Sequence, residues 1–205
     1  MENRRKNMPL TQNSESQTAD TGTSPIRLPD ADGIKKLVAA ITDQILEEYG
    51  SQKAGSFVLV GIHRNGVPLA KRIASAIAER TGKTPETGMI DITLYRDDIG
   101  LRKILPDIQP TSLPDIDGAD VILVDDILQS GRTIRAALDA ITDFGRPAKV
   151  RLAALFDRGN REFPIRPDYL GENVTVPEDQ RISISWKELS GEEDTVLLTP
   201  KKRFA

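Results

Sequence analysis

Short apolar runs along the chain alternate with segments in which apolar residues recur every three or four positions. Phe57–Val60 and Val121–Val124 are continuous apolar runs, a pattern typical of strands buried on both faces of a sheet. The composition of residues 87–95 and 149–156 predicts two further strands. Apolar and polar residues alternate over Arg181–Trp186, which indicates a half-exposed strand, and we assign its tryptophan to packing.

Three amphipathic helices are predicted between these strands. The first begins near Asp30 and ends at Gly50, the second follows Gly66, and the third follows the Val121–Val124 strand. Strands that alternate with helices predict an α/β fold, in which a mostly parallel twisted sheet is flanked by helices and ligands bind at the carboxyl ends of the strands. The helix positions expected to face the core are Ile34, Leu37, Val38, Ile41, Ile45, Leu46, Ala70, Ile73, Ala74, Ile77, Ile134, Ala137, Leu138 and Ile141.

The two ends of the chain differ from the centre. Residues 1–26 are rich in Ser, Thr, Gln and Asn, and are predicted to form a disordered tail because they offer little apolar surface to offset the entropy of ordering. Residues 27–190 are then one domain, and the polar stretch 191–205 is a C-terminal tail. Residues 96–118 combine Pro, Asp and Gly with little periodicity, which is typical of a lid or another excursion from the fold.

Composition excludes several classes of protein. The chain has 205 residues and a formal net charge of −3, which gives no general electrostatic reason for strong nucleic-acid binding. The absence of Cys excludes disulfides and thiolate metal sites and favours a reducing cytoplasm. The single His63 excludes clusters that need several imidazoles. We find neither an apolar run near the roughly 20 residues of a membrane span nor the apolar core of a signal peptide.

The clearest chemistry lies where the Val121–Val124 strand passes into the third helix. Residues 129–133 open that helix, so unpaired backbone N–H groups and the positive end of the helix dipole face the turn. Ser130 and Thr133 each add a hydroxyl, and Gly131 lets the backbone approach a ligand closely. The turn is therefore predicted to bind a phosphate.

Asp125 and Asp126 need a different partner, because two carboxylates would repel a phosphate. They can accept hydrogen bonds from a pair of sugar hydroxyls and tolerate a divalent cation nearby, so the whole corner predicts a sugar-phosphate site. Two other interpretations stay open. The residues could simply cap a strand and a helix, or the aspartates could form a receiver-like metal site, although we cannot place the further Asp and Lys that such a site needs.

The spacing of these residues resembles a known motif. Two acids, two apolar residues, any residue, Ser or Thr, Gly, any residue and Thr are similar to the 5-phosphoribosyl 1-pyrophosphate (PRPP) motif of type I phosphoribosyltransferases. Segments 61–73, 91–98 and 157–171 further resemble the PyrR family of pyrimidine operon regulators, which are bifunctional uracil phosphoribosyltransferases. The resemblance extends over about residues 30–189.

The resemblance implies a type I phosphoribosyltransferase fold with a small hood and a flexible flap. The implied reaction joins uracil to PRPP and gives uridine 5′-monophosphate (UMP) and pyrophosphate, with Mg²⁺ held mainly by the substrate and no dedicated ligand cluster. Asp125 and Asp126 would hold the ribose hydroxyls. Arg96 would act from the flap, together with Tyr95, although it could instead form a surface ion pair with Asp97 or Asp98.

The resemblance also assigns binding residues. The loop from Gly61 to Gly66 would meet the pyrophosphate with its backbone, helped by Arg64, although Asn65 stands where the family commonly has Arg. The base would lie at the end of the fourth strand against Phe156, Asp157 and Arg158, of which Phe156 could equally belong to the core. The residues implied to bind PRPP are His63, Arg64, Asn65, Gly66, Ile127, Leu128, Gln129, Ser130, Gly131, Arg132 and Thr133.

A second activity is implied as well. Regulators of this family bind the leader RNA of pyrimidine genes when UMP is bound, and so control transcription attenuation. Arg161 and Arg166 lie in a matched segment and are the main candidates for RNA contact. Further basic candidates are Lys35, Lys36, Arg146, Lys149, Arg151 and Arg158, whereas Asp43, Asn160 and Glu172 stand where the family commonly has His or Lys.

Three functions therefore remain open. They are a uracil-specific transferase, an RNA-binding regulator with weak or no transferase activity, and a phosphoribosyltransferase for another base. Self-association into a dimer or tetramer is expected in each case.

Overall fold

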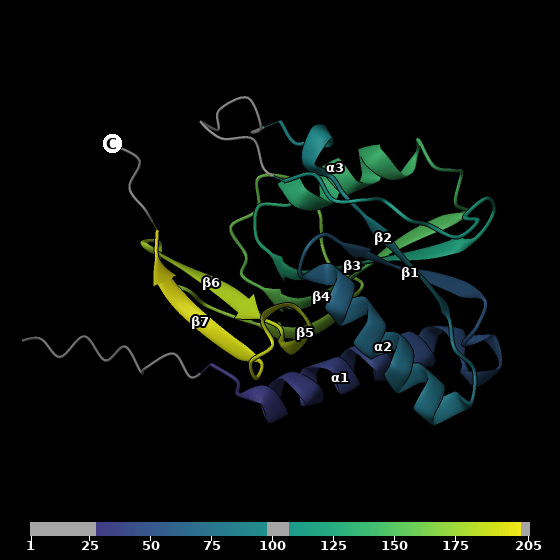
Figure 1. Cartoon of the computed structure of the whole chain (residues 1–205), viewed down its shortest axis with the longest axis horizontal. Coiled ribbons are helices and arrows are strands. Elements are labelled where there is room, and N and C mark those ends of the chain that lie inside the picture. The colour runs from purple at the N-terminus through teal and green to yellow at the C-terminus, as the bar shows by residue number, and fades with distance from the viewer. Residues whose placement is uncertain (1–27, 98–106, 202–205) are drawn as a thin grey trace, which may run out of the picture.

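The fold is organised around a five-stranded parallel sheet. The computed structural model describes residues 28–97 and 107–201, so the predicted N-terminal tail and residues 98–106 of the predicted flap lie outside the described residues. The strands lie in the order β2-β1-β3-β4-β5 (Figure 1). Their bounds are β1 Phe57–Ile62, β2 Glu86–Ile90, β3 Asp120–Leu128, β4 Lys149–Asp157 and β5 Tyr169–Asn173.

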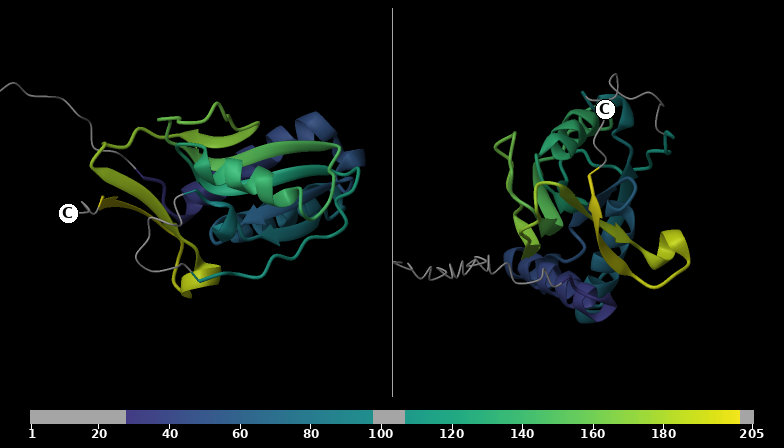
Figure 2. Two further views of the ribbon diagram at one scale, coloured as in Figure 1. Left: turned by 90° about the horizontal axis from the view of Figure 1, so that it is seen from above. Right: turned by 90° about the vertical axis from the view of Figure 1, so that its left-hand side faces the viewer.

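Helices cover both faces of the sheet, as predicted. Helices α1 (Ala31–Tyr49) and α2 (Gly66–Thr81) pack on one face and α3 (Arg132–Ile141) on the other (Figures 1 and 2). The first helix begins where the Asp30 side chain accepts a hydrogen bond from Gly33 N at 2.8 Å, and it ends at Gly50, as the sequence indicates. Within the described residues, the longest helices are too polar or too short to cross a bilayer.

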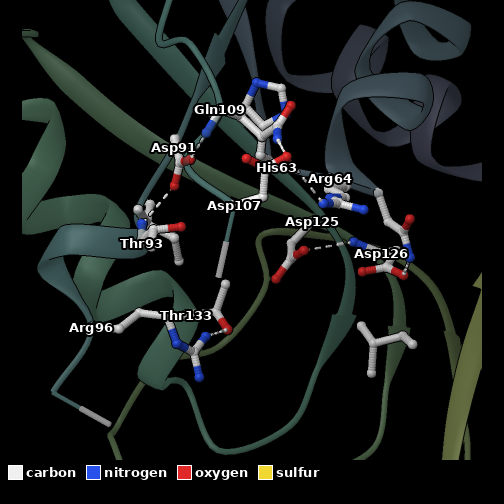
Figure 3. Close-up of a pocket in the computed structure, with 13 residues that line it drawn as sticks. His63, Arg64, Asp91, Thr93, Arg96, Asp107, Gln109, Asp125, Asp126 and Thr133 are labelled. Carbon is white, nitrogen blue, oxygen red and sulfur yellow. Dashed lines mark hydrogen bonds and ion pairs between the residues drawn. The ribbon is translucent and has the colours of Figure 1, made fainter. Parts of the chain in front are cut away.

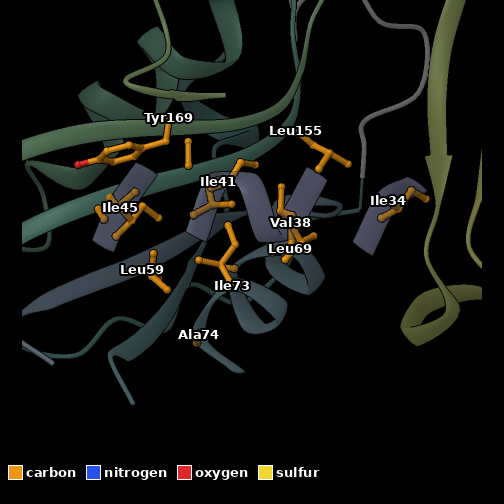
Figure 4. Packing of buried hydrophobic residues seen from close by; sticks show 14 of the residues in the cluster. Ile34, Val38, Ile41, Ile45, Leu59, Leu69, Ile73, Ala74, Leu155 and Tyr169 are labelled. Carbon is orange, nitrogen blue, oxygen red and sulfur yellow. The ribbon is translucent and has the colours of Figure 1, made fainter. Parts of the chain in front are cut away.

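The core is divided by the sheet into two clusters. Alternate residues of β3 point to opposite faces, so Ile122 and Val124 pack with α1 and α2, whereas Val121 and Leu123 pack with α3. Figure 4 shows the larger cluster, in which isoleucines of α1 and α2 interlock beneath the strands. These β3 residues are completely buried, which explains why a central strand reads as a continuous apolar run.

A small hood lies beside the sheet. It consists of the antiparallel strands β6 (Gln180–Ser185) and β7 (Thr195–Pro200), with the short helix α4 (Lys187–Ser190) between them (Figure 2). Trp186 is fully buried, and the Arg72 guanidinium of α2 lies 4.6 Å from its ring centroid. Arg72 also pairs with Glu188 at 2.7 Å and with Asp194, so the hood is fixed to α2. The packing role assigned to the tryptophan is confirmed.

The third predicted strand is shorter than expected. Strand β2 ends at Ile90, and Thr93–Tyr95 instead form a 3₁₀ turn, η2. The cause lies in Asp91, whose carboxylate accepts a hydrogen bond from Thr93 N at 2.6 Å and so turns the chain away from the sheet. Strand β3, by contrast, continues beyond the apolar run to Leu128 and carries the two acids within it.

Two further expectations differ from the structure. Leu138 is 38% exposed, although the other predicted core positions of α3, Ile134, Ala137 and Ile141, are buried. The small residues Ala136 and Ala140 are buried as well and let the helix lie close to the sheet. The stretch from Gly191, expected to be a polar tail, contains β7. Within it Val196 is 6% exposed because it packs into the larger core cluster, a burial that its polar neighbours conceal in the sequence.

We predict that β7 is needed for a stable fold. Replacing Val196 by Asp places a charge in the core and is expected to lower the free energy of unfolding by about 3 kcal/mol. The matched change Leu197→Asp, on the 47% exposed neighbour, is expected to change it by less than about 1 kcal/mol. Urea denaturation followed by circular dichroism measures both, and equal effects at the two positions would contradict the assignment.

Candidate active site

A polar cavity lies at the carboxyl ends of β1, β2 and β3, where the fold class predicts a ligand site. Its volume is about 540 Å³. The side chains that line it come from the loop after β1, from the end of β2 with η2, from the segment that begins at Asp107, and from β3 with the start of α3 (Figure 3). They are His63, Arg64, Asn65, Asp91, Ile92, Thr93, Arg96, Asp107, Gln109, Asp125, Asp126, Ile127 and Thr133.

Glycines bring the loop after β1 directly against β3. A Cβ atom on Gly66 would lie 2.1 Å from the carbonyl oxygen of Val124, and one on Gly61 would lie 2.6 Å from Val67 Cα. Neither position can therefore carry a side chain without moving the backbone. Gly66 does not line the cavity itself. Its absent side chain lets His63, Arg64 and Asn65 reach the cavity beside the acids that follow Val124.

The acidic pair is buried yet borders the cavity. Asp125 is 7% exposed and Asp126 is 9% exposed. Burial, followed by the negative charge of Asp126, raises the pKa of Asp125 well above its ordinary value. Burial also raises the pKa of Asp126, although a hydrogen bond from Asn65 Nδ2 at 2.7 Å favours its charged form. The pair is thus a concentrated acceptor site that hydroxyl donors or a cation would stabilise.

Arg96 faces this pair from the other side of the cavity (Figure 3). Its guanidinium donates to Thr133 Oγ1 at 3.2 Å, and its positive charge offsets a small part of the rise in the pKa of Asp125. Asp97, one of the two surface partners considered for Arg96, lies 2.6 Å from Arg132 of α3, and Asp98 lies outside the described residues. The structure therefore places Arg96, Thr133 and the acids around one cavity.

The predicted phosphate turn has the expected backbone. Gly131 adopts φ 89°, in the left-handed region that favours glycine, and α3 begins at the next residue. The segment after β4 holds the turn by hydrogen bonds. Ser130 O accepts from the backbone N–H groups of Glu162 and Phe163, and Gln129 O accepts from the Arg161 guanidinium at 2.7 Å. Of the predicted residues from Leu128 to Thr133, only Thr133 lines the cavity, and Leu128 is buried in the core.

Arg132 is used within the fold rather than in the cavity. Its guanidinium pairs with Glu162 at 2.5 Å and with Asp97 at 2.6 Å, and it lies 5.5 Å from the ring centroid of Phe163. Ile127, in contrast, lines the cavity from β3, as the motif implies. The turn is therefore braced by the ion pairs of Arg132, and Ile127 and Thr133 on either side of it line the cavity.

The residues predicted to face the base do not line the cavity and are used within the fold. Phe156 is fully buried in the larger core cluster. Asp157 pairs with Arg161 at 2.5 Å, and Arg158, 6% exposed, donates to the carbonyl oxygens of Pro177 and Gln180 at 2.9 and 2.7 Å. These contacts tie the end of β4 to the start of the hood, and none of the three residues lines the cavity.

Five cavity residues were not predicted from the sequence. They are Asp91, Ile92, Thr93, Asp107 and Gln109. Burial opposes ionisation of Asp91, but hydrogen bonds from Thr93 and Gln109 outweigh it and lower the pKa. An acid directly after the buried Ile90 repeats the arrangement of Asp125 after Val124, and this repetition could have identified Asp91.

The site offers few ligands for a resident metal. Over residues 28–97 and 107–201, no group of three or more His, Asp or Glu side chains is arranged to hold an ion. A cation at the acidic pair would therefore depend on oxygens supplied by a bound substrate.

Comparisons with known proteins place these features in context. Residues 27–186 match the family model described as "Phosphoribosyl transferase domain". "Bifunctional protein PyrR" of Roseiflexus sp. is 49% identical over 170 residues, which cover 82% of this chain and 92% of the relative. The protein of the same name from Corynebacterium glutamicum is 45% identical over 185 residues, which cover 88% of this chain and 95% of the relative.

Solved structures share the fold. A hypoxanthine phosphoribosyltransferase of Trypanosoma cruzi superimposes with a TM-score of 0.61 at 17% sequence identity, over 85% of this chain and 96% of that one. A hypoxanthine-guanine phosphoribosyltransferase from Bacillus anthracis gives 0.54 at 20% identity, over 77% and 87% of the two chains. The predicted α/β class with a hood is confirmed as the type I phosphoribosyltransferase fold.

We predict that Asp125 destabilises the ligand-free protein at neutral pH. Because its folded pKa lies above the ordinary value of 3.8, the native state retains this proton longer than the unfolded state. Its contribution to stability is complete below that value and is lost as the pH rises through the folded pKa. Asp125→Asn should therefore raise the melting temperature at neutral pH by several degrees, and much less near the ordinary pKa. Scanning calorimetry across this range measures the difference, and a constant difference would contradict the prediction.

Proposed function

We propose that this chain, which belongs to the PyrR family of phosphoribosyltransferases, makes UMP and pyrophosphate from uracil and PRPP. The observation that carries the proposal is the buried pair Asp125 and Asp126, which borders a cavity between the loop after β1 and the turn before α3. PRPP is a ribose that carries a phosphate at one end and a pyrophosphate at the other. Its hydroxyls can bind the acidic pair, and its two phosphate groups can bind the turn and the loop.

The substrate is oriented by charge. Its ribose hydroxyls donate to the two carboxylates, which accept hydrogen bonds and repel phosphate. The 5′-phosphate lies in the turn 129–133, where backbone N–H groups and the hydroxyls of Ser130 and Thr133 are available. The pyrophosphate meets the loop 63–66 with Arg64, whose guanidinium is exposed and has an acidic neighbour in Asp107 at 3.8 Å.

Mg²⁺ is the cofactor that this arrangement suits. Carboxylate and phosphate oxygens are the ligands that Mg²⁺ prefers, and the buried pair has an excess of negative charge that a cation offsets. Asp125 and Asp126 would hold it together with oxygens of the substrate. When bound, the ion neutralises charge on the pyrophosphate leaving group.

The reaction needs positioning more than covalent chemistry. Glycosyl transfer of this kind passes through an oxocarbenium-like state, in which positive charge develops on the ribose beside the acids. The nearby carboxylates stabilise that charge, and Arg96, on the opposite wall of the cavity, faces the departing anion. Exclusion of water from the cavity prevents hydrolysis of the oxocarbenium-like ribose before the base attacks it.

The base is placed between the end of β4 and the hood. Asp157 and Arg158 are held by ion pairs and carbonyl contacts, so their backbone is rigid enough to read the edge of uracil. Phe156 supports this segment from the core. We infer that these residues determine base selectivity because they fix the backbone at the end of β4. The side chain of Phe156 need not contact the base.

A second function, UMP-dependent binding of pyrimidine-leader RNA, is favoured by similarity to relatives named "bifunctional". The structure reduces the cations available for it. Lys35, Lys149, Arg151 and Arg161 pair with acids, and Arg158 is buried. Within the described part of the chain, the cations of the predicted set with neither an ion-pair partner nor burial are Lys36, Arg146 and Arg166.

We predict that purified protein forms UMP from uracil and PRPP in the presence of Mg²⁺, and that Asp125→Asn lowers kcat/KM by about 100-fold or more, because it removes charge that faces the reacting ribose. A radiolabelled-uracil assay measures turnover. Asp115→Asn, a change to an exposed acid away from the cavity, serves as the control.

Parallel assays with orotate, hypoxanthine and guanine test base selectivity. Turnover of one of these in preference to uracil, or unchanged turnover in Asp125→Asn, would overturn the proposed reaction or the role of this acid respectively.

For RNA binding, we predict a mobility shift of pyrimidine-leader RNA that strengthens with UMP and weakens steeply with salt. Arg166→Ala should reduce the slope of log affinity against log salt by about 1, because one phosphate contact is lost. Arg181→Ala, on the hood, provides a matched exposed-cation control. Binding that ignores UMP, or an effect as large in the control, would exclude this mode of RNA recognition.

A further inference from the structure

Asn65 connects three elements of the site. It follows β1 in the loop that precedes α2, and its Nδ2 atom lies 2.7 Å from Asp126 Oδ2 on β3 and 3.3 Å from the carbonyl oxygen of Ile184 on β6. Both partners are acceptors, so the nitrogen rather than the oxygen of the amide must face them. One side chain thus joins the loop, the acidic pair and the hood.

These contacts leave the amide without a donor for an anionic ligand. A primary amide has two N–H groups, and here one donates to Asp126 and the other to Ile184. The remaining Oδ1 atom is an acceptor and would be repelled by pyrophosphate. The Asn65 side chain therefore acts on a ligand indirectly, through its hydrogen bond to Asp126, and does not bind the pyrophosphate itself.

Both ends of this connection are firmly held. On one side, Gly66 packs against the Val124 carbonyl so closely that a Cβ atom would lie 2.1 Å away, which fixes the backbone of Asn65 against β3. On the other side, Ile184 is 6% exposed and belongs to a hood that is tied to α2 through the ion pairs of Arg72. The amide consequently has little freedom to shift away from the carboxylate.

We propose that Asn65 is a positioning residue that orients the Asp126 carboxylate toward a ribose diol and couples this orientation to strand β6. The inference rests on the proposed function, because it assumes that the acidic pair binds the diol. A free carboxylate next to Asp125 would turn to separate the two charges, and the hydrogen bond from Asn65 opposes that rotation.

The test compares ligands that differ only in the diol. Isothermal titration calorimetry measures the affinities of UMP, 2′-deoxy-UMP and 3′-deoxy-UMP for the wild-type protein and for Asn65→Ala. The wild type is expected to prefer UMP over at least one deoxy analogue. Asn65→Ala is expected to lose about tenfold in that preference, the size of one hydrogen bond to a charged group. Pyrophosphate affinity, measured separately, should stay within about twofold, because the amide has no donor for it.

A second variant separates orientation from packing. Asn65→Leu keeps the volume of the side chain but cannot donate, so it should lose the same preference as Asn65→Ala. Gln44→Ala is the matched control, because its amide likewise joins two elements, donating to Ala40 O at 3.1 Å and Leu170 O at 2.8 Å, far from the cavity. It should retain the wild-type preference.

The outcomes distinguish the inference from the function on which it rests. A wild-type protein that binds UMP and the deoxy analogues equally would remove the diol site itself. A wild type that discriminates, with Asn65 variants that discriminate equally well, would overturn the role of Asn65 alone. A loss of pyrophosphate affinity as large as the loss for UMP would show that Asn65 is a direct ligand, which also overturns the inference.

Discussion

Two neighbouring carboxylates buried at the end of β3 repel each other and lose hydration, and much of the surrounding structure offsets that cost. The hydrogen bond from Asn65 stabilises the charge of Asp126, and the positive charge of Arg96 offsets a small part of the rise in the pKa of Asp125. The hydrogen bond from Asn65 requires the loop after β1 to lie against β3, which the absence of a side chain at Gly66 permits. The close approach of these two backbones is therefore the constraint on which the site depends.

Most cations near the site brace the frame and do not face the cavity. Arg132 joins α3 to Asp97 and Glu162, Arg158 joins β4 to the hood, and Arg161 holds both Asp157 and the carbonyl of Gln129. Such internal use keeps the turn and the hood in place without a ligand. It also leaves the cavity with an excess of negative charge, so an anionic substrate fits best when it arrives with its own divalent cation.

The sequence predicts the parts of this architecture that depend on continuous burial. β1, β3 and β4 have apolar runs because both faces of each strand are covered, and the acids after Val124 mark a ligand site because charge is costly there. The end of β2 and strand β7 were not predicted correctly. The end of β2 depends on a hydrogen bond that the Asp91 carboxylate accepts from Thr93 N, and β7 depends on the burial of Val196 among polar neighbours. Gln109 reaches the cavity through a contact with Asp91, 18 residues earlier, to which its backbone N–H donates, and such a contact leaves no local pattern in the sequence.

Asn65 shows how one substitution can shift the balance of charge in such a site. An arginine at this position would place a permanent cation beside Asp126 and compete with a substrate-bound metal for its carboxylate. The neutral amide orients the same carboxylate while leaving its charge to the ligand. The cation of this loop is found one residue earlier, at Arg64, which is exposed at the cavity and free of contact with the acidic pair in the described part of the chain. In the proposed function, orientation of the acids and attraction of the pyrophosphate are divided between two adjacent residues, Asn65 and Arg64.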